Sequence, residues 1–154
     1  MNRKLRDLGF DAIGVDLSED RGAFTEHCFL GSAYDDLAGK YGRFPVVLSL
    51  EVIEHLYDPR RFARTAYDLL EPGGIAIIST PFHGYWKNLA LALTARMDSH
   101  FTALWDGGHI KFWSERTLAT LLREAGFSGI RFVRAGRIPA LAKSMIAIAR
   151  KAPG

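Results

Sequence analysis

The sequence predicts an α/β fold in which strands and helices alternate about a mostly parallel sheet. Two apolar stretches, residues 46–50 and 75–78, support this prediction, and the second is apolar on both faces, as a central parallel strand should be. The residues between them have the pattern of a helix. A strand-helix-strand unit of this length joins parallel strands by a right-handed crossover, so we expect the helix to cover one face of the sheet.

The chain has the size and composition of one globular domain. Its 154 residues are 48% hydrophobic, which is enough to form a core, so we expect a single domain over residues 1–154. The formal net charge of +3 comes from 20 basic and 17 acidic residues, and the basic residues form no dense stripe. The composition therefore argues against nucleic acid as a partner.

Signals for a membrane or an oxidising compartment are missing from the sequence. Cys28 is the single cysteine, so no disulfide can form within the chain. No apolar run reaches about 18 residues, and residues 1–7 lack the apolar centre of a signal peptide. We expect a cytoplasmic protein without a transmembrane segment, and the sequence leaves a homodimer open.

Short elements are expected in the first third of the chain. Gly9 ends a helix that includes residues 4–8, and the apolar residues 12–15 form a strand that ends at Asp16. The next expected elements are a helical or loop stretch at 18–26, a weak strand at 28–30 and a polar, glycine-containing passage at 31–43.

The helix between the two apolar strands has signals at both ends. Asp58 can cap its N-terminus, and Pro59 suits its first turn. Residues 72–74, Pro-Gly-Gly, end the helix before the second strand. The apolar residues that recur at the spacing of one buried helix face are Phe62, Ala66, Leu69 and Leu70.

The last third begins with an aromatic-rich insertion, residues 82–112, which contains a short helix at 89–97. The insertion either grips a flat or long apolar ligand or forms a satellite of the core. Ser114 then caps a helix that Gly126 ends. The strands expected after this helix are residues 130–133 and 145–149.

Asp16 stands at the end of an apolar strand, and the ends of parallel strands are where such sheets bind ligands. A carboxylate there can accept hydrogen bonds from the two hydroxyls of a ribose. The same carboxylate can also cap a following helix. From this residue alone, the two interpretations are equally good.

Four segments taken together resemble one enzyme family. They are Asp16-Leu17-Ser18, Leu50-Glu51-Val52-Ile53-Glu54-His55-Leu56, Leu70-Glu71-Pro72-Gly73-Gly74 and Ser79-Thr80-Pro81. In this order and at these separations they resemble the class I S-adenosylmethionine-dependent methyltransferases, and in particular the group similar to the ubiquinone-biosynthesis O-methyltransferases. The resemblance runs over about residues 5–149, and it implies a Rossmann-like three-layer sandwich.

The resemblance assigns residues to the adenosine part of the cofactor. It implies that Asp16 holds the ribose hydroxyls and that Leu17 packs on the adenine. Ser32 and Ala33 fall where the family has an Asp and a small residue near the adenine amino group. Ser32 replaces that Asp, so this contact departs from the family pattern.

The resemblance also implies a methionine side and an acceptor side of the site. Leu50 and Glu51, at the mouth of the strand, would line the methionine part of the cofactor. His55, one turn further on, could accept a proton as a methyl group is transferred, or it could simply pack its helix. His109 is the residue of the insertion best placed to contact a substrate. We therefore predict His55 and His109 as the catalytic residues.

The sequence predicts no metal site. His83, His100 and His109 are widely spaced and have no accompanying cysteine or carboxylate cluster. Glu54 is expected to make structural hydrogen bonds near the sheet end rather than to take part in the chemistry.

The family places a first strand and a Gly-x-Gly turn ahead of the helix that we expect at residues 4–8. Neither is found in this sequence. The resemblance places that strand at the centre of the sheet, between the strands that end at Asp16 and Leu50. We therefore expect an N-terminally truncated methyltransferase domain whose affinity for the cofactor is weak.

Three functions are compatible with these observations. The first is methyl transfer from S-adenosylmethionine to a small-molecule acceptor, with oxygen as the expected acceptor atom. The second is a non-catalytic binding module that keeps the fold and uses the insertion to bind a partner. The third is a nicotinamide-dependent dehydrogenase, because an acidic residue after a strand suits that fold too. The segment from Glu51 to Leu56 favours the first.

Overall fold

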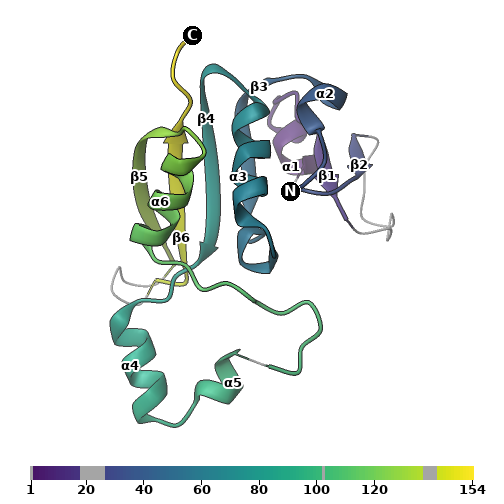
Figure 1. Ribbon diagram of the computed structural model, residues 1–154. Helices are drawn as coiled ribbons and strands as arrows, with labels where there is room; N and C mark the ends of the chain where they lie inside the picture. The colour runs from purple at the N-terminus through teal and green to yellow at the C-terminus, as the bar shows by residue number, and fades with distance from the viewer. Residues whose placement is uncertain (1, 18–26, 102, 137–141) are drawn as a thin grey trace.

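The computed structural model describes residues 2–17, 27–101, 103–136 and 142–154, and the stretch predicted at 18–26 lies outside these ranges. A four-stranded sheet forms its centre, in the order β3-β4-β6-β5 (Figure 1). β3 and β4 are parallel, and β6 is antiparallel to β4 and β5, so β3, β4 and β5 share one direction. These strands are β3 (Phe44–Leu50), β4 (Leu70–Pro81), β5 (Ser128–Ala135) and β6 (Ser144–Arg150).

A second, two-stranded sheet pairs β1 (Gly14–Asp16) with β2 (Cys28–Leu30) in parallel. Within the described ranges, no ladder joins this pair to the larger sheet. The strands that end at Asp16 and Leu50 therefore do not pair with each other. β3 is an edge strand, and Val46 and Leu48 on it are 48% and 38% exposed.

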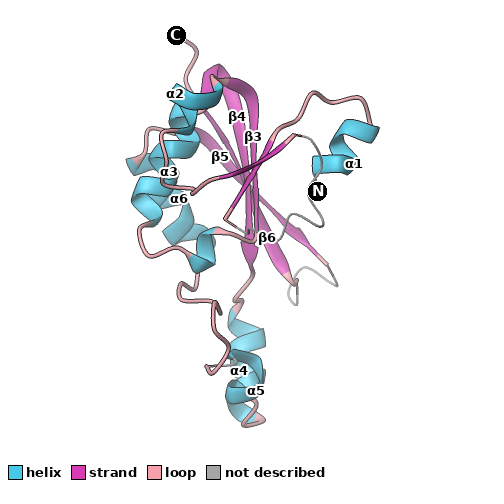
Figure 2. Cartoon of the chain, turned by 90° about the vertical axis from the view of Figure 1, so that its right-hand side faces the viewer, coloured by secondary structure: helices cyan, strands magenta, loops and turns pink. Residues whose placement is uncertain are grey.

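Helices lie on both sides of the strands, as the sequence predicts (Figure 2). α3 (Pro59–Asp68) and α6 (Glu115–Glu124) pack on one face of the larger sheet, and α2 (Leu37–Tyr41) lies on the same side. α1 (Asn2–Asp7) lies on the other side. The polar passage at 31–43 thus contains a helix, α2, that the sequence does not reveal.

The core lies between the two long helices, α3 and α6, and the central strands β4 and β6. Leu70 and Ile78 of β4, Leu118 and Leu122 of α6, and Met145 of β6 are at most 1% exposed. Where the helices approach the sheet closely, the side chains between them must be small, because larger ones would not fit. The buried alanines at these positions are Ala63, Ala66, Ala147 and Ala149.

Both helix caps predicted from the sequence are present. The carboxylate of Asp58 accepts a hydrogen bond of 3.0 Å from the N–H of Arg61 at the start of α3. At the start of α6, the N–H of Thr117 donates to Ser114 Oγ at 3.2 Å, and the N–H of Ser114 donates to Thr117 Oγ1 at 3.0 Å. This pair forms a capping box. Gly126, with a φ of 102°, follows α6 as predicted.

The insertion contains two helices that extend beyond one end of the sheet (Figure 1). They are α4 (Tyr85–Leu93) and α5 (Met97–Phe101), so the prediction of one helix over 89–97 is wrong. Ala95 has a φ of 51°, a left-handed conformation through which a right-handed helix cannot continue. No helix within the described ranges is long and apolar enough to cross a membrane.

β4 begins earlier than the sequence predicts. Leu70 already pairs with Phe44 of β3, and the regular ladder starts at Ile75. Residues 71–74 form a bulge between these two points, and Gly73 within it has a φ of 78°. The Pro-Gly-Gly sequence therefore marks an irregularity inside the strand, so the prediction that it ends the preceding helix is wrong: α3 already ends at Asp68.

Candidate active site

The residues predicted to bind a cofactor lie at the carboxyl ends of three strands. β1 ends at Asp16 and is followed by Leu17, Ser32 and Ala33 follow β2, and β3 ends at Leu50 and is followed by Glu51. Asp16 is exposed, and the side chain of Leu17 is 68% exposed. Both are therefore accessible to a ligand. That any of these residues contacts a cofactor stays a prediction.

Ser32 takes part in a local turn. Its N–H donates to the carboxylate of Asp35 at 2.8 Å, and its Oγ accepts the N–H of Tyr34 at 3.2 Å. The hydroxyl oxygen of Tyr34 accepts the N–H of Asp58 at 3.0 Å. The loop after β2 is thus attached to the N-terminus of α3.

Glu51 turns the chain sharply at the end of β3. Its φ of 53° lies in the left-handed region, and the 3₁₀ turn η2 (Ile53–His55) follows. Ile53 and Glu54 are 0% and 1% exposed, whereas the side chain of His55 keeps 32% of its surface accessible. The turn therefore places a buried carboxylate beside an accessible imidazole.

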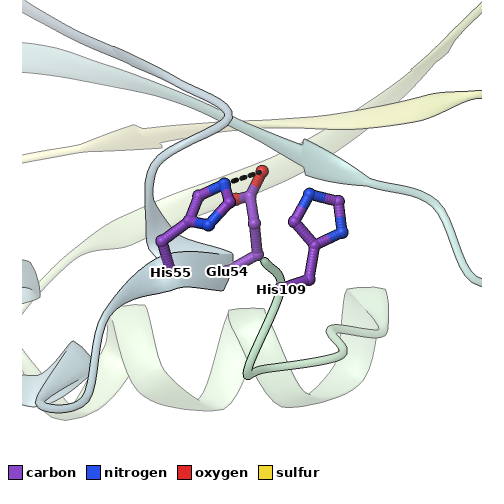
Figure 3. Close-up of side chains that lie close together, drawn as sticks. All are labelled: Glu54, His55 and His109. Atoms are coloured by element: carbon purple, nitrogen blue, oxygen red, sulfur yellow. Dashed lines mark ion pairs between the residues drawn. The ribbon is translucent and has the colours of Figure 1, made fainter. Parts of the chain in front are cut away.

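The two histidines predicted as catalytic lie together, although they come from distant parts of the sequence. Their ring centroids are 4.8 Å apart in an edge-to-face arrangement (Figure 3). Glu54 Oε1 is 3.9 Å from Nε2 of His55. The indole ring of Trp105 lies 6.4 Å from the ring of His55. The site therefore includes Glu54, for which the sequence predicts a structural role only.

Backbone groups of the insertion hold this cluster together. The N–H groups of Ile110 and Lys111 both donate to the carbonyl of Glu54 at 2.9 Å. The carbonyl oxygen of Gly108 lies 3.2 Å from Nδ1 of His55. Because a carbonyl only accepts, Nδ1 carries the proton, and Nε2 of the neutral ring keeps a lone pair. The end of the insertion thus selects the tautomer of His55.

Burial controls the charge of this cluster. Burial is the main cause that raises the pKa of the Glu54 carboxyl, and Glu51 adds to the rise. The backbone N–H of Glu54 itself, the Thr80 hydroxyl and His55 oppose it. Burial also lowers the pKa of His109, and the nearby charge of His55 lowers it further, so the neutral form of His109 is favoured. Although the Thr80 hydroxyl acts on the pKa of Glu54, neither carboxylate oxygen of Glu54 has a partner within hydrogen-bonding distance and angle in the described part of the chain. Such an unsatisfied buried carboxylate is typical of functional sites.

Replacing Glu54 by glutamine should make the protein more stable at neutral pH. Because burial raises the pKa of Glu54, the folded protein binds more protons than the unfolded one between about pH 4.3, the ordinary pKa of Glu, and the raised pKa of Glu54, so stability falls as pH rises through this window. The neutral amide of Glu54→Gln escapes this loss, which is at most about 1.4 kcal/mol per pH unit. Melting temperatures measured from pH 4 to pH 8 should therefore diverge, with the variant higher at pH 8.

Glu71→Gln is the matched control for this measurement, since Glu71 is exposed in the bulge of β4. Its melting curve should follow that of the unmodified chain across the pH range. Parallel curves for Glu54→Gln and the unmodified chain would contradict the prediction.

Glu54, His55 and His109 also form a donor set for a divalent cation. Each offers one ligand atom, and these atoms lie within 4.8 Å of one another. Two nitrogens and one oxygen suit zinc and similar ions. The ligand atoms of a tetrahedral zinc ion are about 3.4 Å apart, so the side chains would have to move closer to bind one. The absence of a metal site stays a prediction.

His83 and His100 belong to a separate aromatic cluster. The ring of His83 lies 6.1 Å from that of His100, 6.0 Å from Phe101 and 5.0 Å from Phe112. Burial lowers the pKa of His83 to about 4, and the charge of Lys87 adds to this effect. His83 and His100, which are widely spaced in the sequence, thus lie near each other, and neither belongs to a three-ligand group in the described residues.

A family model matches most of the chain. The model is described as a methyltransferase domain, and it covers residues 1–131. The strand ends and the cluster after β3 therefore lie within the matched region. The chain belongs to this methyltransferase family.

Among curated proteins, the chain is similar to ubiquinone biosynthesis O-methyltransferases. It is 31% identical over 136 residues to the one from Ruegeria pomeroyi, a match that covers 80% of this chain and 53% of the relative. It is 41% identical over 95 residues to the one from Caulobacter sp. strain K31, covering 55% of this chain and 37% of the relative. The chain thus spans about half the length, or less, of these relatives.

A solved structure confirms the predicted fold class. The chain superimposes on a SAM dependent methyltransferase from Archaeoglobus fulgidus with a TM-score of 0.71 at 17% identity, covering 97% of this chain and 80% of that one. An identity this low shows the fold alone. The α/β, Rossmann-like architecture is therefore that of the methyltransferases.

Proposed function

We propose that the chain carries the site of an S-adenosylmethionine-dependent methyl transfer to an oxygen of a small-molecule acceptor. The observation that carries the proposal is the cluster of Glu54, His55 and His109, which directly follows the strand end where the cofactor is predicted to bind. Membership of the methyltransferase family supports the reaction. The similarity to O-methyltransferases supports oxygen as the acceptor atom.

Residues at the strand ends fit the two halves of the cofactor. The exposed Asp16 and Leu17 suit the ribose hydroxyls and the adenine, with the pair Ser32-Ala33 beside them. The backbone of Leu50 and the side chain of Glu51 suit the methionine half. When bound, S-adenosylmethionine supplies a methyl group that leaves its sulfonium sulfur as the acceptor oxygen bonds to the carbon.

We infer that His55 accepts the proton that the acceptor hydroxyl loses. Its Nε2 keeps a lone pair, because Nδ1–H donates to Gly108. A proton on Nε2 creates a positive charge 3.9 Å from Glu54 Oε1. Opposite charges about 4 Å apart attract by about 4 kcal/mol at an effective dielectric constant of about 20. His109, whose neutral form is favoured by its lowered pKa, can orient the acceptor hydroxyl.

An NMR titration of the 154-residue chain tests cofactor binding. Added S-adenosylmethionine should shift the amide resonances of Asp16, Leu17 and Glu51, and such shifts report weak binding as well as tight binding. Mass spectrometry should then detect the methyl ether of 1,2-dihydroxybenzene, used as the acceptor probe. No shifts and no ether would overturn the proposal, and methylation of an aniline probe alone would overturn the choice of oxygen.

Asp16→Asn provides the site-specific arm of this experiment. Loss of hydrogen bonds to a charged carboxylate should weaken S-adenosylmethionine binding about tenfold to a hundredfold. Asp68→Asn is the matched control, because Asp68 is an exposed residue at the end of α3. Equal affinities for the two variants would remove Asp16 from the site.

Exposed apolar side chains in the insertion favour a second candidate, a non-catalytic binding module. Trp86 is 63% exposed and Leu104 is 99% exposed. Binding of S-adenosylmethionine without transfer to any probe would support this module. Shifts at Asp16 caused by a nicotinamide dinucleotide, but not by S-adenosylmethionine, would instead support a dehydrogenase.

A further inference from the structure

Glu51 has a backbone conformation that residues with a side chain rarely adopt. Its φ is 53°, and among the non-glycine residues that the structure describes, only Ala95 also has a positive φ. Such a conformation persists only where the surroundings hold it. At Glu51 it directs the chain from β3 into η2, the turn that carries Glu54 and His55.

Ser79 of β4 holds this conformation through three contacts. The N–H of Glu51 lies 3.1 Å from the Ser79 carbonyl oxygen and also 3.1 Å from Ser79 Oγ, and it donates to both. The Ser79 hydroxyl in turn donates to Glu51 Oε1 at 2.8 Å. One hydroxyl thus restrains both the backbone and the side chain of Glu51. Ser79 is 5% exposed, so water competes little for these bonds.

The register of the sheet brings the two residues together. Leu50 pairs with Ser79 in the parallel ladder, so Glu51 leaves β3 beside the Ser79 side chain. The neighbouring strand offers a comparison, because Ser49 of β3 has a buried Oγ with no hydrogen-bond partner in the described residues. The two serines are close in the sheet, but only Ser79 is bonded to the turn.

We propose that Ser79 is a positioning residue for the methyl-transfer site. By fixing Glu51, it sets the direction of the carboxylate on the methionine side and the position of His55 on the acceptor side. This inference rests on the proposed function, since the groups that Ser79 positions are those assigned to cofactor and acceptor. Ser79 itself touches neither ligand.

Ser79→Ala tests the proposal with two kinds of measurement. The KM for S-adenosylmethionine should rise about tenfold, the effect of losing one hydrogen bond to a charged group. The Hε1 resonance of His55 and the amide resonance of Glu51 should move, and exchange of the Glu51 amide with solvent should accelerate. A residue with a merely structural role would lower the melting temperature and leave the KM and these resonances unchanged.

Ser49→Ala is the matched control, because it removes a serine hydroxyl that has no hydrogen-bond partner in the described part of the chain. It should leave the KM and the His55 resonance as they are. Glu51→Gly in the Ser79→Ala background provides a rescue, since glycine adopts the left-handed conformation without a steric cost. The double variant should return the His55 resonance to its original position, although it lacks the carboxylate.

The outcomes separate this inference from the proposed function. If Ser79→Ala leaves the KM, the His55 resonance and Glu51 exchange unchanged while the parent chain transfers methyl groups, the positioning role is wrong and the function stands. If the resonances move but the parent chain neither binds S-adenosylmethionine nor forms the ether, the proposed function fails, and the role of Ser79 in it fails as well. An equal effect of Ser49→Ala would also overturn the inference.

Discussion

His55→Ala should lower the rate of methyl transfer about 10²-fold to 10⁴-fold, the usual contribution of a positioned general base. The rate constant at saturating S-adenosylmethionine, measured with 1,2-dihydroxybenzene as acceptor, is the relevant quantity. His109→Ala should have a smaller effect, and the double variant should lose less than the product of the two.

His27→Ala is the matched control. His27 directly precedes β2 of the two-stranded sheet and does not belong to the cluster of Glu54, His55 and His109. Its rate should equal that of the unmodified chain. A chelator adds a second check. If EDTA abolishes the activity of the unmodified chain and zinc restores it, then His55 acts as a metal ligand, and its assignment as a base is wrong.

Leu122→Ala should reduce the free energy of unfolding by about 2–5 kcal/mol. Leu122 is fully buried on α6 and packs in the core between that helix and the sheet. Since a small domain is stable by about 5–15 kcal/mol in total, this single change brings the fold close to unfolding. Urea denaturation followed by circular dichroism measures the effect.

Leu93→Ala is the matched control, because it makes the same change of leucine to alanine at an exposed position. Leu93 ends α4 and is 78% exposed, so its truncation should change the free energy of unfolding by less than about 0.5 kcal/mol. Similar losses for both variants would show that the core is not where the structure places it.

Elements with strong local signals could be predicted from the sequence. Asp58 and Ser114 cap α3 and α6, as their residue types indicate, because a cap depends on bonds to groups within three residues. The strands β3 and β6 were predictable from their apolar runs at residues 46–50 and 145–149, although β3 is an edge strand whose Val46 and Leu48 are 48% and 38% exposed.

Elements decided by distant contacts were predicted poorly. The start of β4 depends on pairing between Leu70 and Phe44, which the local Pro-Gly-Gly pattern does not reveal. α4 and α5 are separated at Ala95, a residue type that ordinarily favours a helix. In both cases the surrounding structure overrides the local preference.

The candidate site was predicted as separate residues rather than as an arrangement. The sequence identifies His55 and His109 individually, but their contact depends on the N–H groups of Ile110 and Lys111, which bind the carbonyl of Glu54. The importance of Glu54 lies in its burial without a hydrogen-bond partner in the described residues. No pattern in the sequence shows that, because burial is a property of the assembled fold.

The separation of β1 and β2 from the larger sheet has a mechanical consequence. The bond between Tyr34 and the N–H of Asp58 connects the loop after β2 to α3, while no ladder among the described strands spans the two sheets. A ligand held by Asp16 on one side and Glu51 on the other would connect the two sheets and fix one relative to the other. At a concentration of 100 times its dissociation constant, such a ligand adds about 2.7 kcal/mol of stability. Ligand binding and the fixing of one sheet relative to the other would then be a single equilibrium.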